Sequence, residues 1–155
     1  INASSDEIQV KFRFNWVDYA GNGNIVIGLV EDLDATNQYF DYGATGLFAR
    51  INHHSGWNGI RVDAVFHDLD LYRQQEPRID IGGTGNWLQV ELIVEDGDWT
   101  LTLKDNNGNL IGERSGTLPA EHSEFQYFMI FKDETNGWET SRGYFDDLEI
   151  RGLEK

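Results

Sequence analysis

Four hydrogen-bonding side chains stand in two short alternating runs near the middle of the chain. Arg50 and Asn52 alternate with the apolar residues of 47–51, and Arg61 and Asp63 alternate with those of 60–66. Alternate residues of a strand point to opposite faces, so each pair predicts a polar strand face. If the two strands are neighbours, a cross-strand spacing of about 4.5–5.5 Å gathers all four into one patch. Such a patch suits a polyhydroxylated ligand; the alternative is an ordinary solvated sheet face with weak ion pairs.

Two tryptophans lie in segments that show no strand alternation. Trp57 follows Ser-Gly and precedes Asn, and Trp138 follows Asn-Gly and precedes Glu. An exposed aromatic ring can hold the apolar face of a sugar while amides and guanidinium groups bond the hydroxyls. Both tryptophans are therefore either ligand platforms or lids over the core. Trp16, Trp87 and Trp99 fall at strand ends in register, and we expect them in the core or at a sheet edge.

The other residues that could bind a metal or act as bases form weaker patterns. His53 and His54 are adjacent, and on a strand end they would point in opposite directions, away from a shared metal. His67 and His122 have no obvious partners. Residues 105–109, Asp-Asn-Asn-Gly-Asn, have the composition of a calcium loop but lack its 12-residue frame and terminal Glu, so we predict a hairpin turn.

Period-two alternation recurs along the whole chain, and amphipathic helical periodicity is nearly absent. We count roughly nine or ten strands separated by turn signals, which is the spacing of a sandwich or barrel. The clearest region is a three-strand meander over 87–111, with a hairpin turn at Asp96-Gly97. A short turn near 118–124 is the only helix candidate. The sequence predicts one all-β domain over residues 1–155, a two-sheet antiparallel sandwich closed by a last strand over 143–152.

Composition limits the classes of partner. The 155 residues include 12 Lys and Arg against 27 Asp and Glu, a net charge of −15, so nucleic acid and anionic membranes are poor partners. No apolar run approaches the ~20 residues of a membrane span. The absence of cysteine leaves the redox compartment unspecified. The first residue is Ile rather than Met and no signal peptide precedes the domain, so we expect one module of a larger secreted protein.

Two segments carry a family resemblance. Residues 143–152, Gly-Tyr-Phe-Asp-Asp-Leu-Glu-Ile-Arg-Gly, resemble the closing strand of concanavalin A-like and related jelly-roll sandwiches. Residues 87–103 are similar to the tryptophan, strand, hairpin, strand segment of laminin-G-type domains. The resemblance implies a jelly-roll sandwich. Domains of this type are often carbohydrate-binding modules attached to glycoside hydrolases or polysaccharide lyases, and others are glucanases, lyases, lectins or adhesion domains.

A calcium site is implied by the same resemblance. By alternation we expect Asp146 to share the inward face of Leu148 and Ile150, where a carboxylate needs a cation or backbone donors. In jelly-roll binding modules the first Asp of this motif often ligates structural calcium, helped by an acidic residue near the first strand. Asp6 and Glu7 are the matching candidates, because first and last strands commonly pair. The alternative is that Asp146 caps a turn or accepts main-chain hydrogen bonds.

The enzyme motifs of these families are not found. Glu91 to Glu95 has the wrong spacing for the Glu-x-Asp-x-x-Glu motif of the glucanases, and both strand motifs of the jelly-roll alginate lyases are absent. The sequence therefore predicts a secreted, monomeric, non-catalytic module that binds a polysaccharide or oligosaccharide. Two alternatives stay open: a small glycan hydrolase or lyase that uses His53 or His54 with Tyr and Arg partners, and a protein-binding or adhesion module.

Overall fold

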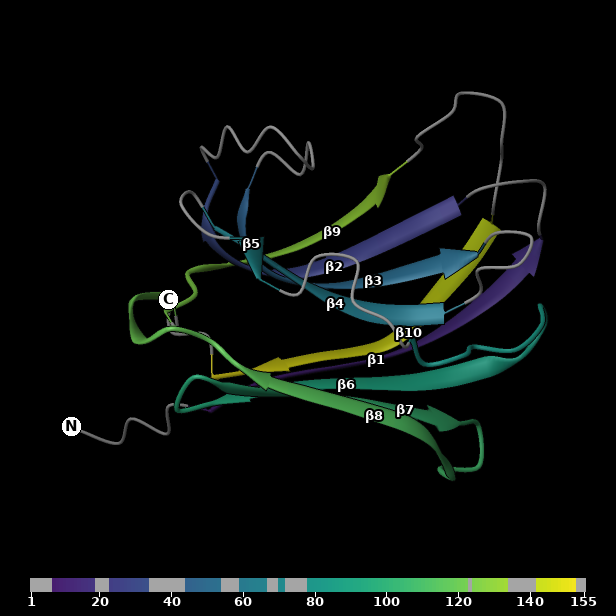
Figure 1. The fold of residues 1–155 in the computed structure, drawn as a ribbon. Helices are drawn as coiled ribbons and strands as arrows, with labels where there is room; N and C mark the ends of the chain where they lie inside the picture. The colour runs from purple at the N-terminus through teal and green to yellow at the C-terminus, as the bar shows by residue number, and fades with distance from the viewer. Residues whose placement is uncertain are drawn as a thin grey trace.

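The computed structural model describes residues 7–18, 23–33, 44–53, 59–66, 70–71, 78–122, 124–133 and 142–152. Within these ranges ten strands form two five-stranded antiparallel sheets that lie face to face (Figure 1). This arrangement confirms the predicted two-sheet β-sandwich. The one helical turn described is a 3-10 turn at Ala120–His122, inside the predicted 118–124 segment. No helix in the described part of the chain is long and apolar enough to cross a membrane.

The two sheets are named here by their strand order. Sheet A runs β10 (Arg142–Arg151), β1 (Glu7–Asp18), β6 (Trp87–Glu95), β7 (Asp98–Asp105) and β8 (Leu110–Thr117). Sheet B runs β5 (Asp70–Leu71), β4 (Gly59–Val65), β3 (Thr45–His53), β2 (Gly23–Asp32) and β9 (Tyr127–Asp133). The last strand, β10, pairs with β1 and forms one edge of sheet A. The first and last strands of the described chain are thus neighbours, as expected.

The core between the sheets follows from the alternation. Along β6 the even-numbered residues from Leu88 to Val94 are buried while the odd-numbered ones are half-buried or exposed. The inward faces of β1, β2, β3, β4 and β7 contribute to the same cluster, which includes Trp99 as predicted. Burial of each large apolar side chain stabilises the fold by about 1.5–3 kcal/mol. Because one face of each strand is buried in this shared core, only the opposite face can contact a ligand.

Two hairpins build the predicted meander β6–β7–β8. Asp96 and Gly97 both have positive φ, 50° and 83°, the geometry of a type I′ turn whose twist matches the strands. In the second hairpin, the Asp105 carboxylate accepts hydrogen bonds from the backbone N–H groups of Asn107 and Asn109 at 2.8 and 2.9 Å. It also accepts one from the Asn109 side-chain amide at 2.8 Å. These bonds, led by that of the Asn109 side chain, lower the pKa of Asp105. The predicted hairpin turn is confirmed.

The central strands of sheet B are buried on both faces, unlike those of sheet A. All seven residues of β4 are buried, whereas the outer face of β6 is not. A second apolar cluster lies on the face of sheet B that points away from the core; its buried members are Val26, Val30, Ala44, Phe48 and Val65. Residues that alternation assigns to the outside of β3 and β4 therefore lie in a buried environment.

His122 has partners that the sequence did not indicate. Its Nδ1 lies 3.1 Å from a carboxylate oxygen of Glu31, at the end of β2. Its ring stacks on buried Phe66, with centroids 4.0 Å apart and planes 14° apart. These contacts tie the 3-10 turn to sheet B across 91 residues of sequence. The geometry gives His122 a packing role at this end of the sandwich.

Candidate functional site

The register of β3 and β4 brings the four predicted polar residues together. Arg50 lies directly opposite Arg61 on the neighbouring strand. Asn52 and Asp63 flank this pair, opposite Gly59 and Phe48 respectively. Since the core-facing residues alternate with them, all four positions belong to the outer face of sheet B. The prediction that neighbouring strands gather them into one patch is confirmed.

This patch is a buried charged cluster rather than an open polar face. Arg50, Arg61 and Asp63 are only 5%, 6% and 0% exposed. Arg61 holds Asp63 through two contacts, Nε to Oδ1 at 3.0 Å and Nη2 to Oδ2 at 3.3 Å. The expected alternative, a solvated sheet face with weak ion pairs, is wrong: these three side chains are buried, and so is the second apolar cluster on the same face. Asn52 is half-buried, and its side-chain oxygen makes no hydrogen bond with the described part of the chain. Trp57 and Trp138 lie outside the described residues, as does His54.

The strand register separates two of the three predicted calcium ligands. Glu7 lies at the start of β1, opposite Glu95. Asp146 lies opposite Arg13, six residues further along the same strand. At about 3.4 Å per residue this places Glu7 and Asp146 roughly 20 Å apart, too far to share one ion. Asp6, the third candidate, lies outside the described residues. The prediction that Glu7 and Asp146 bind the same calcium ion is therefore wrong.

A β-bulge also reverses the expected direction of Asp146. The register slips between Lys11 and Arg13, and Asp147 in the opposing segment has φ of 52°. Phe145 packs against the core, its ring 5.6 Å from that of Phe12, so its neighbour Asp146 does not face inward. Asp146 is exposed, and its carboxylate accepts a hydrogen bond from the backbone N–H of Asp147 at 2.9 Å. The described residues thus show the alternative to calcium, in which Asp146 accepts a main-chain hydrogen bond. Among the described residues no three His, Cys, Asp or Glu side chains group as metal ligands.

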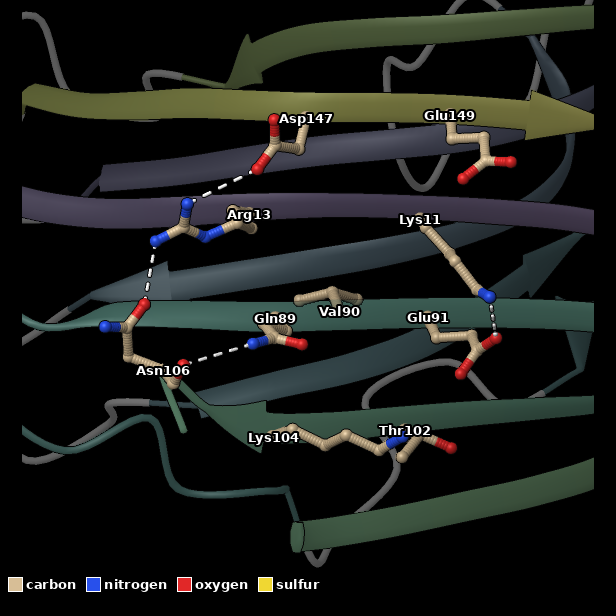
Figure 2. Close-up of a pocket in the computed structure, with 10 residues that line it drawn as sticks. All are labelled: Lys11, Arg13, Gln89, Val90, Glu91, Thr102, Lys104, Asn106, Asp147 and Glu149. Carbon is tan, nitrogen blue, oxygen red and sulfur yellow. Dashed lines mark hydrogen bonds and ion pairs between the residues drawn. The ribbon is translucent and has the colours of Figure 1, made fainter. Parts of the chain in front are cut away.

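An open polar hollow lies on the outer face of sheet A. It has a volume of about 530 Å³ and is lined from β10, β1, β6 and β7 (Figure 2). We call it the outer groove. Two rows of side chains cross the strands within it, because paired residues of neighbouring strands lie side by side. One row consists of Arg13, Gln89 and Lys104; the other consists of Glu149, Lys11, Glu91 and Thr102.

The first row centres on the Arg13 guanidinium. One of its terminal nitrogens donates to Asn106 Oδ1 at 2.7 Å, and the other lies 3.3 Å from Asp147 Oδ2 (Figure 2). The guanidinium carbon also lies 4.9 Å from the centroid of the Trp87 ring, within cation–π range. Gln89 donates to the main-chain oxygen of Asn106 at 3.4 Å. Arg13 is thus held in place by groups from three directions.

The second row holds its carboxylates in pairs. Glu91 lies 3.0 Å from the ammonium nitrogen of Lys11 and accepts a 2.8 Å hydrogen bond from Gln9. Glu149 is paired with Arg151 on its own strand. Lys104 forms no ion pair with any described residue, and its ammonium group carries three donors into the groove. The groove therefore offers cations, carboxylates, amides and a hydroxyl in fixed positions.

The outer groove was not predicted as a site. β1 and β6 are separated by about half of the chain and pair only in the folded sheet. The signal that could have found it is the run of hydrogen-bonding side chains Gln9, Lys11 and Arg13 in the first strand, matched by Gln89 and Glu91 in the sixth. No family model and no curated protein matches this chain.

Proposed function

We propose that this chain is a non-catalytic carbohydrate-binding module whose glycan lies in the outer groove. The observation that carries the proposal is the alignment, on one open sheet face, of charged, amide and hydroxyl side chains from four strands. A sugar chain presents hydroxyls that both donate and accept hydrogen bonds, and this set of groups can satisfy both roles. On the resemblance, we also place the chain among the concanavalin A-like jelly-roll modules of larger secreted proteins.

The charges of the groove favour a neutral glycan. Lys11, Arg13 and Lys104 are balanced by the three carboxylates of Glu91, Asp147 and Glu149. The whole chain carries −15, so an anionic polysaccharide would meet long-range repulsion without a local excess of cations to offset it. Spacing between strands is about 4.8 Å, so the face from β10 to β7 spans roughly 15 Å, enough for about three sugar units across the strands.

The carboxylates of the groove each lie beside a cation. Glu91 is paired with Lys11, Asp147 with Arg13, and Glu149 with Arg151. These groups are suited to fix the donors of the groove and to accept hydrogen bonds from sugar hydroxyls.

The test is affinity electrophoresis of the purified chain in gels that contain neutral or acidic polysaccharides. We expect retardation by a neutral polysaccharide, and loss of most of it in the double variant Gln89→Ala, Lys104→Ala. Both side chains are proposed to hydrogen-bond the glycan, so together they should contribute about 1–3 kcal/mol to the binding free energy, or roughly 5- to 150-fold in affinity. The matched control is Ser115→Ala, an exposed residue of sheet A that does not line the groove.

Three outcomes would contradict the proposal. Retardation that the double variant leaves unchanged would remove the groove and direct attention to the buried cluster around Arg50, Asn52, Arg61 and Asp63. Release of reducing ends or unsaturated products would make the chain a hydrolase or lyase, the alternative in which His53 or His54 acts. Binding to no glycan, together with capture of a protein ligand, would make it an adhesion module.

A structural calcium ion is a separate part of the proposal. Asp146 keeps an exposed carboxylate beside the bulge, and hard oxygen ligands are abundant in the chain. EDTA would lower the melting temperature of a calcium-stabilised domain, and added calcium would restore it. If Asp146 is a ligand, Asp146→Asn abolishes that shift. A shift that survives the substitution would assign the ion to other residues, and no shift would remove calcium.

A further inference from the structure

A second hollow adjoins the outer groove at the end of sheet A. It measures about 640 Å³ and lies between the start of β6, the β7–β8 turn and the segment before β6. Asn106 lines both hollows, and its side-chain and main-chain oxygens are the ones that accept from Arg13 and Gln89. The two spaces therefore meet at one residue, which belongs to the walls of both.

The lining of this hollow differs in character from that of the groove. It contains the half-buried indole of Trp87 and the exposed side chain of Ile111, 43% accessible, beside the amides of Asn86 and Asn107. The groove, by comparison, has charged groups at most positions and no aromatic in its lining. An aromatic and an aliphatic surface with neighbouring amides match a pyranose ring, which has an apolar face and a hydroxylated rim.

The rim of the hollow is unobstructed. A β-carbon built on Gly82, Gly83 or Gly85 meets no heavy atom within 4 Å, so the segment before β6 leaves open space. The Arg13 guanidinium over the Trp87 ring links the indole to the first row of the groove. A ligand that runs along Arg13 and Gln89 therefore approaches Trp87 across Asn106, the residue that the two hollows share.

We propose that the hollow beyond Asn106 is an end subsite of the same glycan track, where Trp87 and Ile111 seat the apolar face of one sugar ring. This inference rests on the proposed function and adds a direction in which the glycan lies along the site. The groove holds the middle of the chain by hydrogen bonds, and the hollow holds one end by apolar contact. Oligosaccharides that fit within the groove gain nothing from the hollow, whereas longer ones do.

The experiment is isothermal titration of a length series of oligosaccharides from the polysaccharide that retards the protein. The variants are Ile111→Ser and its matched control Leu110→Ser, the neighbouring exposed residue of β8 at 62% accessible, which lines neither hollow. We expect Ile111→Ser to weaken binding of the long oligosaccharides about fivefold and to leave the short ones unchanged. Leu110→Ser should leave all lengths unchanged.

A second variant provides a larger expected loss of affinity than Ile111→Ser. Trp87→Ala removes the larger apolar surface, and it should weaken the long oligosaccharides about tenfold or more relative to the short ones. Melting curves of all variants check that the domain remains folded. Unchanged long-chain affinity in both Ile111→Ser and Trp87→Ala, or an equal loss at every length, overturns the end subsite while leaving the groove in place. Binding of no oligosaccharide by the wild type would overturn the proposed function itself, and the subsite with it.

Discussion

At the scale of single residues, burial decides what a charged side chain can do. Arg61 and Asp63 are almost completely buried on the outer face of sheet B, while Arg13 and Lys11 occupy an equivalent face of sheet A and remain partly open to solvent. All four side chains are charged, but Arg61 and Asp63 are enclosed in an interior, whereas Arg13 and Lys11 remain accessible on an open face. A buried pair stabilises only as long as both partners are present.

Asp63→Asn is expected to destabilise the domain strongly. The substitution removes the charge that compensates the Arg61 guanidinium 3.0 Å away, and both side chains are buried. The free energy of unfolding should fall by about 3 kcal/mol, measured by urea denaturation. Glu95→Gln, at an exposed position of β6, is the control and should change it by less than about 0.5 kcal/mol. A loss from Asp63→Asn no larger than that of the control would show that the pair is not energetically important.

The sequence could predict the facing of side chains, but not what covers each face. Alternation placed Arg50, Arg61 and Asp63 on one face correctly, because it depends only on neighbours along the strand. Their burial, which they share with a second apolar cluster on the same face that includes Phe48, is not revealed by any local pattern. Asp146 was placed on the wrong face, because a bulge shifts the alternation by one residue. The positive φ of Asp147 carries no sequence signal of the kind that a glycine would give.

At the scale of elements, the two hairpins of the β6–β7–β8 meander fix the floor of the groove. Gln89 and Glu91 stand on β6, and Thr102 and Lys104 stand opposite them on β7. A slip of one residue in the connecting turn would exchange the polar and apolar faces of a strand. The turn residues Asp96 and Gly97 therefore control the position of groove residues that lie far from them. This meander was the part of the fold best predicted from sequence, since its contacts are local.

Gly97→Ala should weaken the first hairpin. Gly97 has a φ of 83°, a conformation that costs an alanine about 1 kcal/mol or slightly more, and the free energy of unfolding should fall by that amount. Gly83→Ala is the matched control: this glycine lacks a positive φ and its added β-carbon meets nothing within 4 Å. Urea denaturation of both variants measures the difference. An equal effect of the two substitutions would contradict the role of the backbone conformation.

The second hairpin should respond to acid. Hydrogen bonds to the Asp105 carboxylate lower its pKa from 3.8, so the folded state binds the proton less readily than the unfolded state. The resulting stabilisation is present above about pH 4 and is lost as the pH falls through the lowered pKa. In Asp105→Asn this contribution is absent, so the wild type should lose more stability than the variant on acidification. Melting temperatures at a series of acidic pH values test this, and parallel curves would contradict it.

At the scale of the whole molecule, charge repulsion opposes the compact state. The 27 Asp and Glu outnumber the 12 Lys and Arg, which leaves a net charge of −15 over 155 residues. Salt screens such repulsion, with a Debye length that falls from about 30 Å at 0.01 M to about 3 Å at 1 M. The two-sheet architecture follows from alternation and turn chemistry despite this charge. The strand order does not, because the pairing of β1 with both β6 and β10 is a long-range contact that no segment encodes alone.

Added salt should therefore stabilise the domain. Each kcal/mol of relieved repulsion raises the melting temperature of a domain of this size by about 2–4 °C. We expect a progressive rise in melting temperature from about 0.01 to 0.5 M sodium chloride, and the same rise with potassium chloride, since screening does not depend on the cation. A fall would mean that surface ion pairs such as Lys11–Glu91 contribute more than the overall repulsion costs.

The pairing of β1 with β10 has a mechanical consequence. Gln9 lies opposite Arg151, and a β-carbon on Gly152 would touch the carbonyl oxygen of Glu7, so the two ends of the described chain leave the sandwich at one point. Tension applied between those ends would load the ladder one hydrogen-bonded pair at a time and peel the edge strand β10 away from β1. The domain should therefore open at low force, because the hydrogen bonds of the ladder break one after another rather than all at once. Asp147 and Glu149 belong to β10, so detachment of this strand would remove two residues that line the outer groove.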